Sequence, residues 1–406
     1  MKEWKTYRVG DICSSISETC KVHAKEVVLI NTSDVLEGRC LNHEFVPNKD
    51  LKGQFKKVFK FGDILYSEIR PANKRFAYID FDATNYIAST KLMVIRNNDK
   101  VTNRFLYHYL KSESTIAELQ ALAESRSGTF PQITFSELSQ LEISIPDIET
   151  QVAISSFIDT LESKIELNRQ INDNLEQQAQ ALYKSWFVDF EPFCEEEFIE
   201  TSIGSIPAGW KVGQLSDICE IVGGGTPSKS HPEYYCRRGI AWITPKDLSV
   251  SKSKFSSRGS EDITSDGYKN SSAKLMPRGT VLFSSRAPIG YISIATNEIC
   301  TNQGFKSAVP GIAGTGYLYY FLQANTDKIE SKASGSTFKE ASGSLMKALE
   351  VIIPADGIFN QFEAELAPIL NKQENIASEI QTLTTLRDTI LPKLMSGELK
   401  INEIDC

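Results

Sequence analysis

A glycine-rich segment, Gly223-Gly224-Gly225-Thr226-Pro227-Ser228-Lys229-Ser230, is the stretch of this chain most similar to a phosphate-binding loop. A Walker A loop has a glycine directly before its lysine, so that backbone N–H groups can wrap the phosphates, but here that position is Ser228. No acidic strand end that could hold magnesium accompanies the segment. The sequence therefore disfavours an NTPase. It leaves two interpretations open, a turn that presents Thr226, Ser228 and Lys229 to a ligand, or a plain surface loop.

The motifs of common catalytic and metal sites are missing. The eight cysteines include no Cys-x-x-Cys pair, and the four histidines are isolated from one another. There is no Asn-Pro-Pro or Asp-Pro-Pro motif of an amino-methyltransferase, no Gly-x-Ser-x-Gly and no His-Glu-x-x-His. Metal sites need clustered ligands, so we predict no metal site and no catalytic residues. The cysteines are best interpreted as buried free thiols in a reducing cytoplasm.

Basic and amide side chains in turns are the remaining candidates for chemistry. Arginine can bind guanine through two hydrogen bonds, asparagine and glutamine can bind adenine, and lysine mostly contacts phosphates. A solvated surface charge is the competing interpretation for each of them. We predict DNA contacts by Arg70, Lys74, Arg75, Lys91, Arg126, Thr226, Ser228, Lys229, Lys246, Arg286, Asn302, Gln303, Lys306 and Lys339.

An internal repeat organises these candidates into two sets. Five segments of the first half return in the same order in the second half, at offsets of 206 to 217 residues. They are Trp4–Cys13 with Trp210–Cys219, Ile30–Asp34 with Ile243–Asp247, Gly62–Ser67 with Gly279–Ser284, Thr129-Phe130 with Thr337-Phe338, and Leu141–Pro146 with Leu349–Pro354. The segments between them differ, as expected for two modules with different ligands. Arg70 with Arg286, and Lys91 with Lys306, are expected at matching positions of the repeat.

Each half ends in a long helical pattern with apolar residues seven apart. The first stripe is broken at Asn168, whereas the second is continuous. The apolar residues predicted to lie in the seam between the two helices are Ile154, Ile158, Leu161, Ile165, Leu175 and Leu182 in the first helix, and Phe362, Ile369, Ile376, Leu383 and Ile390 in the second. Two such helices predict an antiparallel coiled-coil pair, and 151–187 would span roughly 55 Å. The alternative is an ordinary amphipathic helix that packs on its own domain.

Short strand-like runs and short helices without strict alternation predict an α+β fold for both halves. We expect target-binding domains at 1–146 and 210–356, a central helix at 147–190, an acidic linker at 191–209 and a distal helix at 357–406, with pseudo-twofold symmetry. The net charge of −8 is unevenly distributed. Residues 1–146 carry +2 and 201–356 carry +4, whereas 147–200 carry −10 and 357–406 carry −4. Both globular parts can therefore approach phosphates, and the acidic helices suit protein docking.

Several segments resemble one known family. The segments 203–210, 224–228, 284–290 and 302–306 look like the target recognition modules of the specificity (S) subunit of type I restriction–modification enzymes. Ala179–Phe187 and Leu391–Leu399 resemble the helix ends that close each half in that family. The likeness covers essentially the entire chain. One departure is that the first module has Ser14–Thr19 where the second has its Gly-Gly-Thr-Pro-Ser loop.

The resemblance implies a non-catalytic reader of double-stranded DNA. Each module would recognise one half of a split target, and the helices would set the number of unread base pairs. Two adenine methyltransferase subunits using S-adenosylmethionine would dock, and through them restriction subunits using ATP and Mg. No cofactor is expected in this chain. A bacterial or archaeal cytoplasm and no membrane are expected. The competing functions are a stand-alone nuclease or methyltransferase, and a purely structural coiled-coil adaptor.

Overall fold

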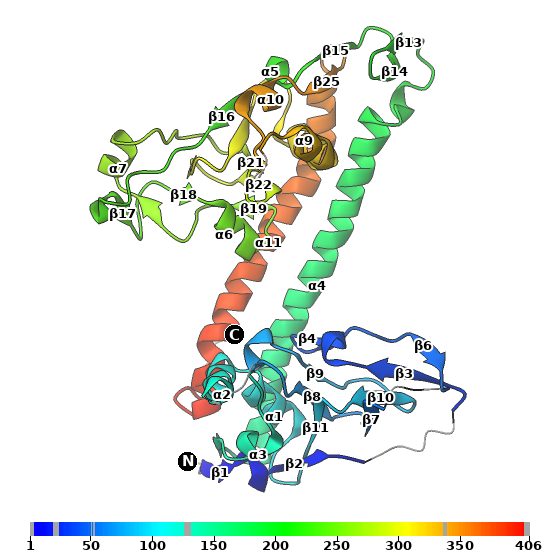
Figure 1. Cartoon of the computed structure of the whole chain (residues 1–406), viewed down its shortest axis with the longest axis vertical. Helices are drawn as coiled ribbons and strands as arrows, with labels where there is room; N and C mark the ends of the chain where they lie inside the picture. The colour runs from blue at the N-terminus through cyan, green and yellow to red at the C-terminus, as the bar shows by residue number, and fades with distance from the viewer. Residues whose placement is uncertain are drawn as a thin grey trace. The chain divides into compact units, whose positions relative to one another are not determined.

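Two long helices, α4 (Ile148–Phe187) and α11 (Ile358–Ser396), dominate the secondary structure (Figure 1). This computed structural model describes residues 4–18, 24–49, 51, 53–125, 131–335 and 339–401. The chain divides into two compact units, residues 1–166 with 382–406, and residues 167–381. Each unit thus contains one globular domain and about half of each long helix. Residues 191–209 contribute to the second unit through a hairpin and the buried Phe193 and Ile206.

The first unit has two four-stranded sheets. One has the order β2-β11-β8-β9 and the other β6-β3-β10-β7. Its strands are β1 (Lys5–Arg8), β2 (Cys13–Ile16), β3 (Glu26–Ile30), β4 (Val35–Leu36), β5 (Arg39–Cys40), β6 (Phe45–Pro47), β7 (Phe55–Val58), β8 (Ile64–Ser67), β9 (Phe76–Tyr78), β10 (Tyr86–Ser89), β11 (Leu92–Asn97) and β12 (Glu142–Ile145). Its helices, besides part of α4 and α11, are α1 (Asn103–Leu110), α2 (Glu113–Glu124) and α3 (Phe135–Leu138).

The second unit is built on a five-stranded sheet of order β16-β24-β21-β22-β19. Its strands are β13 (Phe198–Thr201), β14 (Gly204–Pro207), β15 (Lys211–Gln214), β16 (Cys219–Gly223), β17 (Tyr235–Cys236), β18 (Trp242–Ile243), β19 (Phe255–Ser256), β20 (Asp262–Ile263), β21 (Val281–Ser285), β22 (Ile289–Ala295), β23 (Cys300–Thr301), β24 (Lys306–Pro310) and β25 (Glu350–Ile353). Its shorter helices are α5 (Leu215–Ile218), α6 (Pro245–Ser251), α7 (Ser265–Lys269), α8 (Thr315–Ala324), α9 (Thr326–Lys332) and α10 (Gly343–Lys347).

The strand pairing repeats from one unit to the other. The order β2-β11-β8-β9 returns as β16-β24-β21-β22, and the antiparallel pair β1–β12 returns as β15–β25. The parallel pair β3–β10 has its counterpart in β18–β23. Every residue of β8 and of β21 is buried, which accounts for the apolar runs with which both strands begin. The structure therefore confirms the predicted α+β fold and shows the sequence repeat as one sheet frame used twice.

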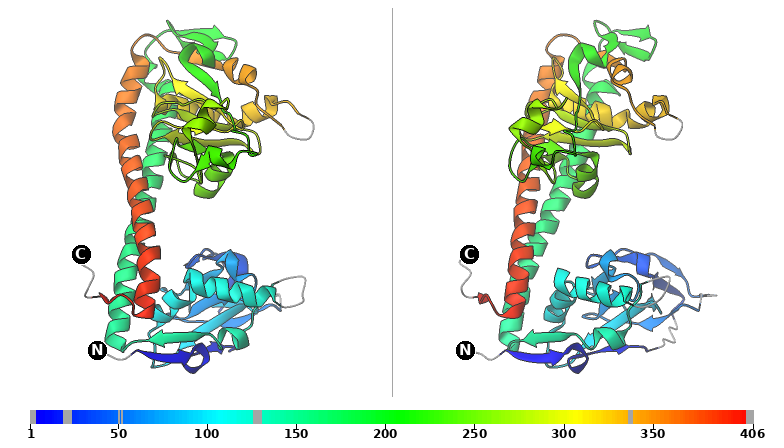
Figure 2. Two further views of the ribbon diagram at one scale, coloured as in Figure 1. Left: turned by 90° about the vertical axis from the view of Figure 1, so that its left-hand side faces the viewer. Right: turned by 60° about the vertical axis from the view of Figure 1, so that its left-hand side comes forward.

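Within each unit, α4 and α11 run antiparallel and lie side by side (Figure 2). In the first unit Ile154 and Ile158 share a core with Leu391 and Leu394. In the second unit, α4 contacts α11 through Phe187, whose ring centre lies 4.9 Å from that of Phe362. The helices also pack on their own domains, so pairing and domain packing occur together.

The predicted seam residues fall into two groups by burial. Ile154, Ile158, Ile165, Phe362 and Ile376 are buried, and Leu161, Leu175, Leu182, Ile369, Leu383 and Ile390 are partly buried. Asn168, which breaks the apolar stripe, is only 2% exposed. It therefore occupies a buried position despite its polarity. Among the described helices, none is long and apolar enough to cross a membrane.

Candidate nucleic-acid interface

One edge of the second unit's sheet gathers most of the residues predicted there. Strand β24 lies antiparallel between β16 and β21, so Gly223 pairs with Lys306, and Ser284 bridges to Phe305. The C-terminal ends of β16 and β21 and the beginning of β24 therefore meet at one edge. The loops at this edge carry Thr226, Ser228, Lys229, Arg286, Asn302 and Gln303, and Lys306 is the first residue of β24.

Hydrogen bonds fix the amide side chains at this edge. The Thr226 hydroxyl donates to the side-chain oxygen of Gln303. The Asn302 side-chain oxygen accepts from the backbone N–H of Gly304 at 2.9 Å. Asn302 and Gln303 are thus oriented by the loop itself, which reduces the entropy that a ligand contact would cost.

Close packing explains the glycines of the glycine-rich segment. A Cβ at Gly224 would lie 2.0 Å from the backbone oxygen of Asn302, and one at Gly225 would lie 2.4 Å from the backbone nitrogen of Ala273. The indole N–H of Trp242 donates to the Gly225 carbonyl at 3.0 Å. These glycines are needed where loops approach each other, rather than to wrap a phosphate. Ser228 and Lys229, which follow them, are exposed.

The cations at this edge surround one carboxylate. Glu340 lies 3.4 Å from the Lys306 ammonium and 3.7 Å from the Arg286 guanidinium. Lys246 is exposed on α6, whose Pro245 packs against Gly304. Lys339, next to Glu340, is also exposed. The structure thus brings Lys246 and Lys339 close to the same edge.

The first unit has a smaller cluster at the corresponding edge. The Lys91 ammonium lies 3.6 Å from Glu68 and 3.4 Å from the side-chain oxygen of Gln132. The backbone N–H of Arg70 donates to the Pro131 carbonyl at 3.0 Å, so the Arg70 backbone lies next to the segment that carries Gln132.

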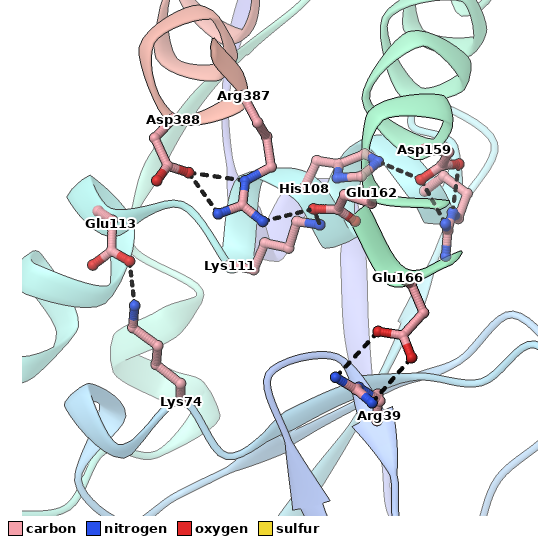
Figure 3. Close-up of polar contacts among 11 residues, drawn as sticks. Arg39, Lys74, His108, Lys111, Glu113, Asp159, Glu162, Glu166, Arg387 and Asp388 are labelled. Carbon is pink, nitrogen blue, oxygen red and sulfur yellow. Dashed lines mark hydrogen bonds and ion pairs between the residues drawn. The ribbon is translucent and has the colours of Figure 1, made fainter. Parts of the chain in front are cut away.

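Two other first-unit candidates, Lys74 and Arg75, have partners inside the unit. Lys74 forms an ion pair with Glu113 of α2 (Figure 3). Arg75 donates to the backbone carbonyls of Ser33 at 2.9 Å and Val35 at 3.4 Å. Arg126 lies outside the described residues. DNA contact by these three residues stays a prediction.

Lys91 and Lys306 do not occupy matching positions, which corrects that expectation. Leu92 pairs with Ser67, whereas Phe305 bridges the matching Ser284. In this register Lys91 corresponds to Gly304, and Lys306 corresponds to Met93, which is 1% exposed. The reason is that the chain between the two paired strands is four residues shorter in the second half.

An ion-pair network in the first unit was not predicted from the sequence (Figure 3). Arg104 of α1 binds Asp159 of α4 through two hydrogen bonds of 2.9 and 2.5 Å, and His108 contacts the same carboxylate at 2.9 Å. Lys111 pairs with Glu162, which also lies 3.9 Å from Arg387 of α11. The network therefore joins one short helix to both long helices.

Electrostatics within this network keep Asp159 ionised and His108 neutral. Burial raises the pKa of Asp159, but hydrogen bonds from His108 and Arg104 outweigh it and hold the pKa at about 2. Burial lowers the pKa of His108 more than the contact with Asp159 raises it. Because a carboxylate only accepts, the Nε2 atom of His108 carries the proton, and its buried Nδ1 has no partner.

The same cluster is the group of potential metal ligands in the described part of the chain. Donor atoms of His108, Asp159 and Glu162 lie within 4.8 Å of one another. Arg104 and Lys111 already neutralise the two carboxylates. These donors do not fit a cation, and we assign the cluster to the attachment of the helices.

The second unit contains a corresponding network around one buried lysine. The Lys254 ammonium donates to Glu176 of α4 at 2.6 Å, to Gln373 of α11 at 2.9 Å and to the Tyr320 hydroxyl of α8 at 2.5 Å. Lys254 is only 13% exposed. Acidic residues of α4 therefore bind cations of both domains, so the helix's negative charge is not wholly available to a partner.

A signal for these networks was present in the sequence. Arg104 and His108 are four apart on one face of α1, Lys111 directly follows that helix, and Asp159 and Glu162 are three apart on α4. Cationic and acidic helix faces of this kind are more often solvated, and nothing in the sequence showed which faces would meet.

The cysteines agree only in part with the expectation of buried thiols. The described cysteines are free, and Cys13, Cys219 and Cys300 are buried, whereas Cys194 is exposed. Burial raises the pKa of the Cys13, Cys219 and Cys300 thiols to about 12. These three thiols are therefore poor nucleophiles at neutral pH.

Comparison with known proteins identifies similar chains. The family described as "Type I restriction modification DNA specificity domain" matches residues 1–177 and 207–394. The type I restriction enzyme HindI specificity subunit of Haemophilus influenzae is 35% identical, over 98% of this chain and 100% of that protein. The MjaIX specificity subunit of Methanocaldococcus jannaschii is 44% identical over 40% of this chain and 38% of that protein. The S subunit of a type I system from M. genitalium has a similar fold, with a TM-score of 0.60 at 15% identity over 97% of this chain and 96% of that one.

Proposed function

This chain belongs to the family of type I restriction–modification DNA specificity subunits, and from that premise we propose that it reads a bipartite DNA target. Each unit would recognise one half of the target in double-stranded DNA. The observation that carries this proposal is the repeated sheet frame with a cluster of basic and amide side chains at the same edge of both units. A duplicated frame with divergent loops is suited to reading two different sequences.

The clusters have the chemistry that base recognition needs. Arg70 and Arg286 can bind guanine, Asn302 and Gln303 can bind adenine, and Lys229, Lys246 and Lys339 can contact phosphates. Lysines that replace counterions make such binding fall with increasing salt. Thr226, Ser228 and Lys306 in the second unit and Lys91 in the first complete the two proposed surfaces, and contact by Lys74, Arg75 and Arg126 stays a prediction.

The chain itself would perform no catalysis. Methyltransferase subunits, two in number, would supply the adenine methylation with S-adenosylmethionine, and restriction subunits would use ATP and Mg. The chain would act in a bacterial or archaeal cytoplasm. The long helices would hold the two reading units and provide surfaces for the methyltransferase subunits.

One candidate docking surface lies beside α4 in the first unit. A groove of about 580 Å³ there is lined by Tyr78 and Arg104 from the domain and by Val152, Ser155 and Thr160 of α4. Val152 is 52% exposed, so an apolar side chain is available next to polar ones. A mixed surface of this kind supports contact with a protein.

Selection from random DNA duplexes tests the proposed function. The chain, co-purified with its methyltransferase subunits, is incubated with a random library at several salt concentrations, and bound duplexes are sequenced. We expect one motif with two specified halves and an unspecified gap, and weaker binding at higher salt. Binding without any enriched motif would support a structural adaptor and contradict the proposal. Cleavage or methylation of DNA by the chain alone would instead support an enzyme.

A further inference from the structure

We propose that Gln132 and Glu340 are equivalent base-reading residues, Gln132 selecting adenine in one half-site and Glu340 selecting cytosine in the other. This inference rests on the proposed function and names a specificity-determining position within it. Neither residue belongs to the set predicted from the sequence. The inference starts from a contact pattern that recurs in both units.

Backbone hydrogen bonds place the two residues at the same point of the repeated frame. The N–H of Ile133 donates to the Glu68 carbonyl, and the N–H of Ala341 donates to the Ser285 carbonyl, both at 2.9 Å. Glu68 and Ser285 each follow the matching serine that ends the shared strand pattern, Ser67 in β8 and Ser284 in β21. Ile133 and Ala341 are fully buried. Each anchors its segment, and the residue before it stands at the edge of the sheet.

The side chains at this position also contact a lysine in the same way. The Lys91 ammonium lies 3.4 Å from the Gln132 side-chain oxygen, and the Lys306 ammonium lies 3.4 Å from a Glu340 carboxylate oxygen. The two lysines come from different positions of the register. The contact with a lysine is therefore made by lysines from different positions of the two sheets. This is expected if the side chain at the position of Gln132 and Glu340 serves to contact a ligand and not to hold the sheet together.

Fold stability does not account for Glu340. Its side chain is 39% exposed, and its contacts with Arg286 and Lys306 are 3.7 and 3.4 Å long. Ion pairs this long, made by a carboxylate that is open to solvent, contribute little. A carboxylate among cations also weakens their attraction for phosphates, so it should lower sequence-independent DNA affinity.

Base recognition gives this carboxylate a role that neither fold stability nor phosphate binding provides. A carboxylate in the major groove can accept a hydrogen bond from the cytosine amino group, whereas a glutamine can bind the N6 and N7 atoms of adenine. The neighbouring lysine would neutralise the carboxylate's repulsion of the backbone. The single difference between Gln132 and Glu340 would thus give the two units different base preferences at an equivalent point.

Exchange of the two side-chain types tests the inference. The co-purified complex carrying Glu340→Gln is subjected to duplex selection beside the wild-type complex. We expect one position of one half-site to change from cytosine to adenine, with a change in preference of at least about fivefold, and the other half-site to stay as in wild type. The matched variant Gln132→Glu should change adenine to cytosine in the other half-site only. Glu340→Ala should accept any base at the first position.

The experiment distinguishes failure of this inference from failure of the proposed function. If the wild-type complex selects a bipartite motif and Glu340→Gln, with an unchanged thermal unfolding midpoint, selects the same motif, Glu340 only balances charge and the inference is overturned. A uniform increase in affinity without a change of motif has the same meaning. If the wild-type complex selects no bipartite motif, the proposed function itself fails.

Discussion

Lys254 shows how a single residue can attach a domain to both long helices. Its ammonium contacts α4 through Glu176 and α11 through Gln373 while it is almost fully buried. Removing one partner of a buried ion pair leaves an uncompensated charge, which is more costly than the pair itself is stabilising. This residue therefore belongs to the attachment of the helices and not to the proposed DNA surface.

The variant Glu176→Gln should destabilise the second unit. We expect a loss of about 2–3 kcal/mol in the free energy of unfolding. Breaking a fully buried ion pair typically costs about 3–5 kcal/mol, and the loss should be smaller here because Glu176 is 24% exposed. Urea unfolding followed by tryptophan fluorescence measures it, since Trp186, Trp210 and Trp242 lie in this unit. Lys184→Gln on the same helix, which removes an exposed ion pair with Asp189 just beyond the helix end, is the control and should cost less than about 1 kcal/mol. Equal losses for both variants would contradict the assignment.

His108 should make the first unit sensitive to acid. Its pKa is lowered in the folded chain, so the folded state resists a proton that the unfolded state binds, and stability falls as the pH drops below about 6.5. Asp159, with a pKa of about 2, adds a further loss between about pH 4 and pH 2. Hydrogen-exchange protection of α1, corrected for intrinsic rates, should decrease from pH 7.5 to pH 5.5.

The variant His108→Gln separates this cause from others. Glutamine can keep a donor toward Asp159 but does not titrate, so protection of α1 should change less between the two pH values, even if it is lower at pH 7.5. His231→Gln, which changes an exposed histidine of the second unit, should leave the dependence of α1 as in wild type. An undiminished dependence in His108→Gln would show that another group is responsible.

At the scale of secondary structure, the repeated segments predicted the strands that the two units share. The sequences of the divergent segments between them did not predict the strands that form there. Strands β8, β12, β21 and β25 lie in apolar runs that recur at nearly constant offsets. Strands β6, β7 and β10 of the sheet β6-β3-β10-β7 lie in none of the repeated segments. Short polar strands of this kind are specified by their neighbours more than by their own residues.

The sequence could predict which residue types belong to the candidate sites, but not which of these residues lie together. Arg286, Asn302, Gln303 and Lys306 lie together because the strand ends that carry them are neighbours, which the repeat alone did not show. Lys74 and Arg75 looked equivalent to them in sequence, yet both have partners inside their unit. Residue type identifies a charge, but only tertiary structure shows what that charge contacts.

The two long helices should together determine the gap in the DNA target. Inserting seven residues after Glu166 and seven after Gln381 would lengthen both helices by about 10.5 Å while keeping each apolar face in phase. At about 3.4 Å per base pair, we expect the gap to grow by about three base pairs with both half-sites unchanged. Duplex selection with the altered complex measures the gap.

An insertion in α4 alone is the matched control. It would shift one helix against the other by a full heptad in one unit or strain the pairing in both, so we expect loss of specific binding and not a longer gap. An unchanged gap after the paired insertion would show that the helices do not set the spacing.

At the scale of the whole molecule, the net charge of −8 is the sum of positive globular parts and negative helical segments. The globular parts at 1–146 and 201–356 carry +2 and +4, and the helical segments hold the negative excess. The structure adds that part of this excess neutralises cations of the domains, at Asp159, Glu162 and Glu176. Charge thus attaches each domain to the helices as well as leaving the domains able to approach DNA.

Mapping of methylated adenines across the source genome, with this gene intact and deleted, tests the central claim most directly. We predict that one motif with two specified halves, separated by a gap of fixed length, carries methylated adenine in the intact strain and loses it completely on deletion. Restoring the gene on a plasmid should restore the same motif. A methylation pattern that is identical in both strains, or a lost motif without two separated halves, would contradict the account.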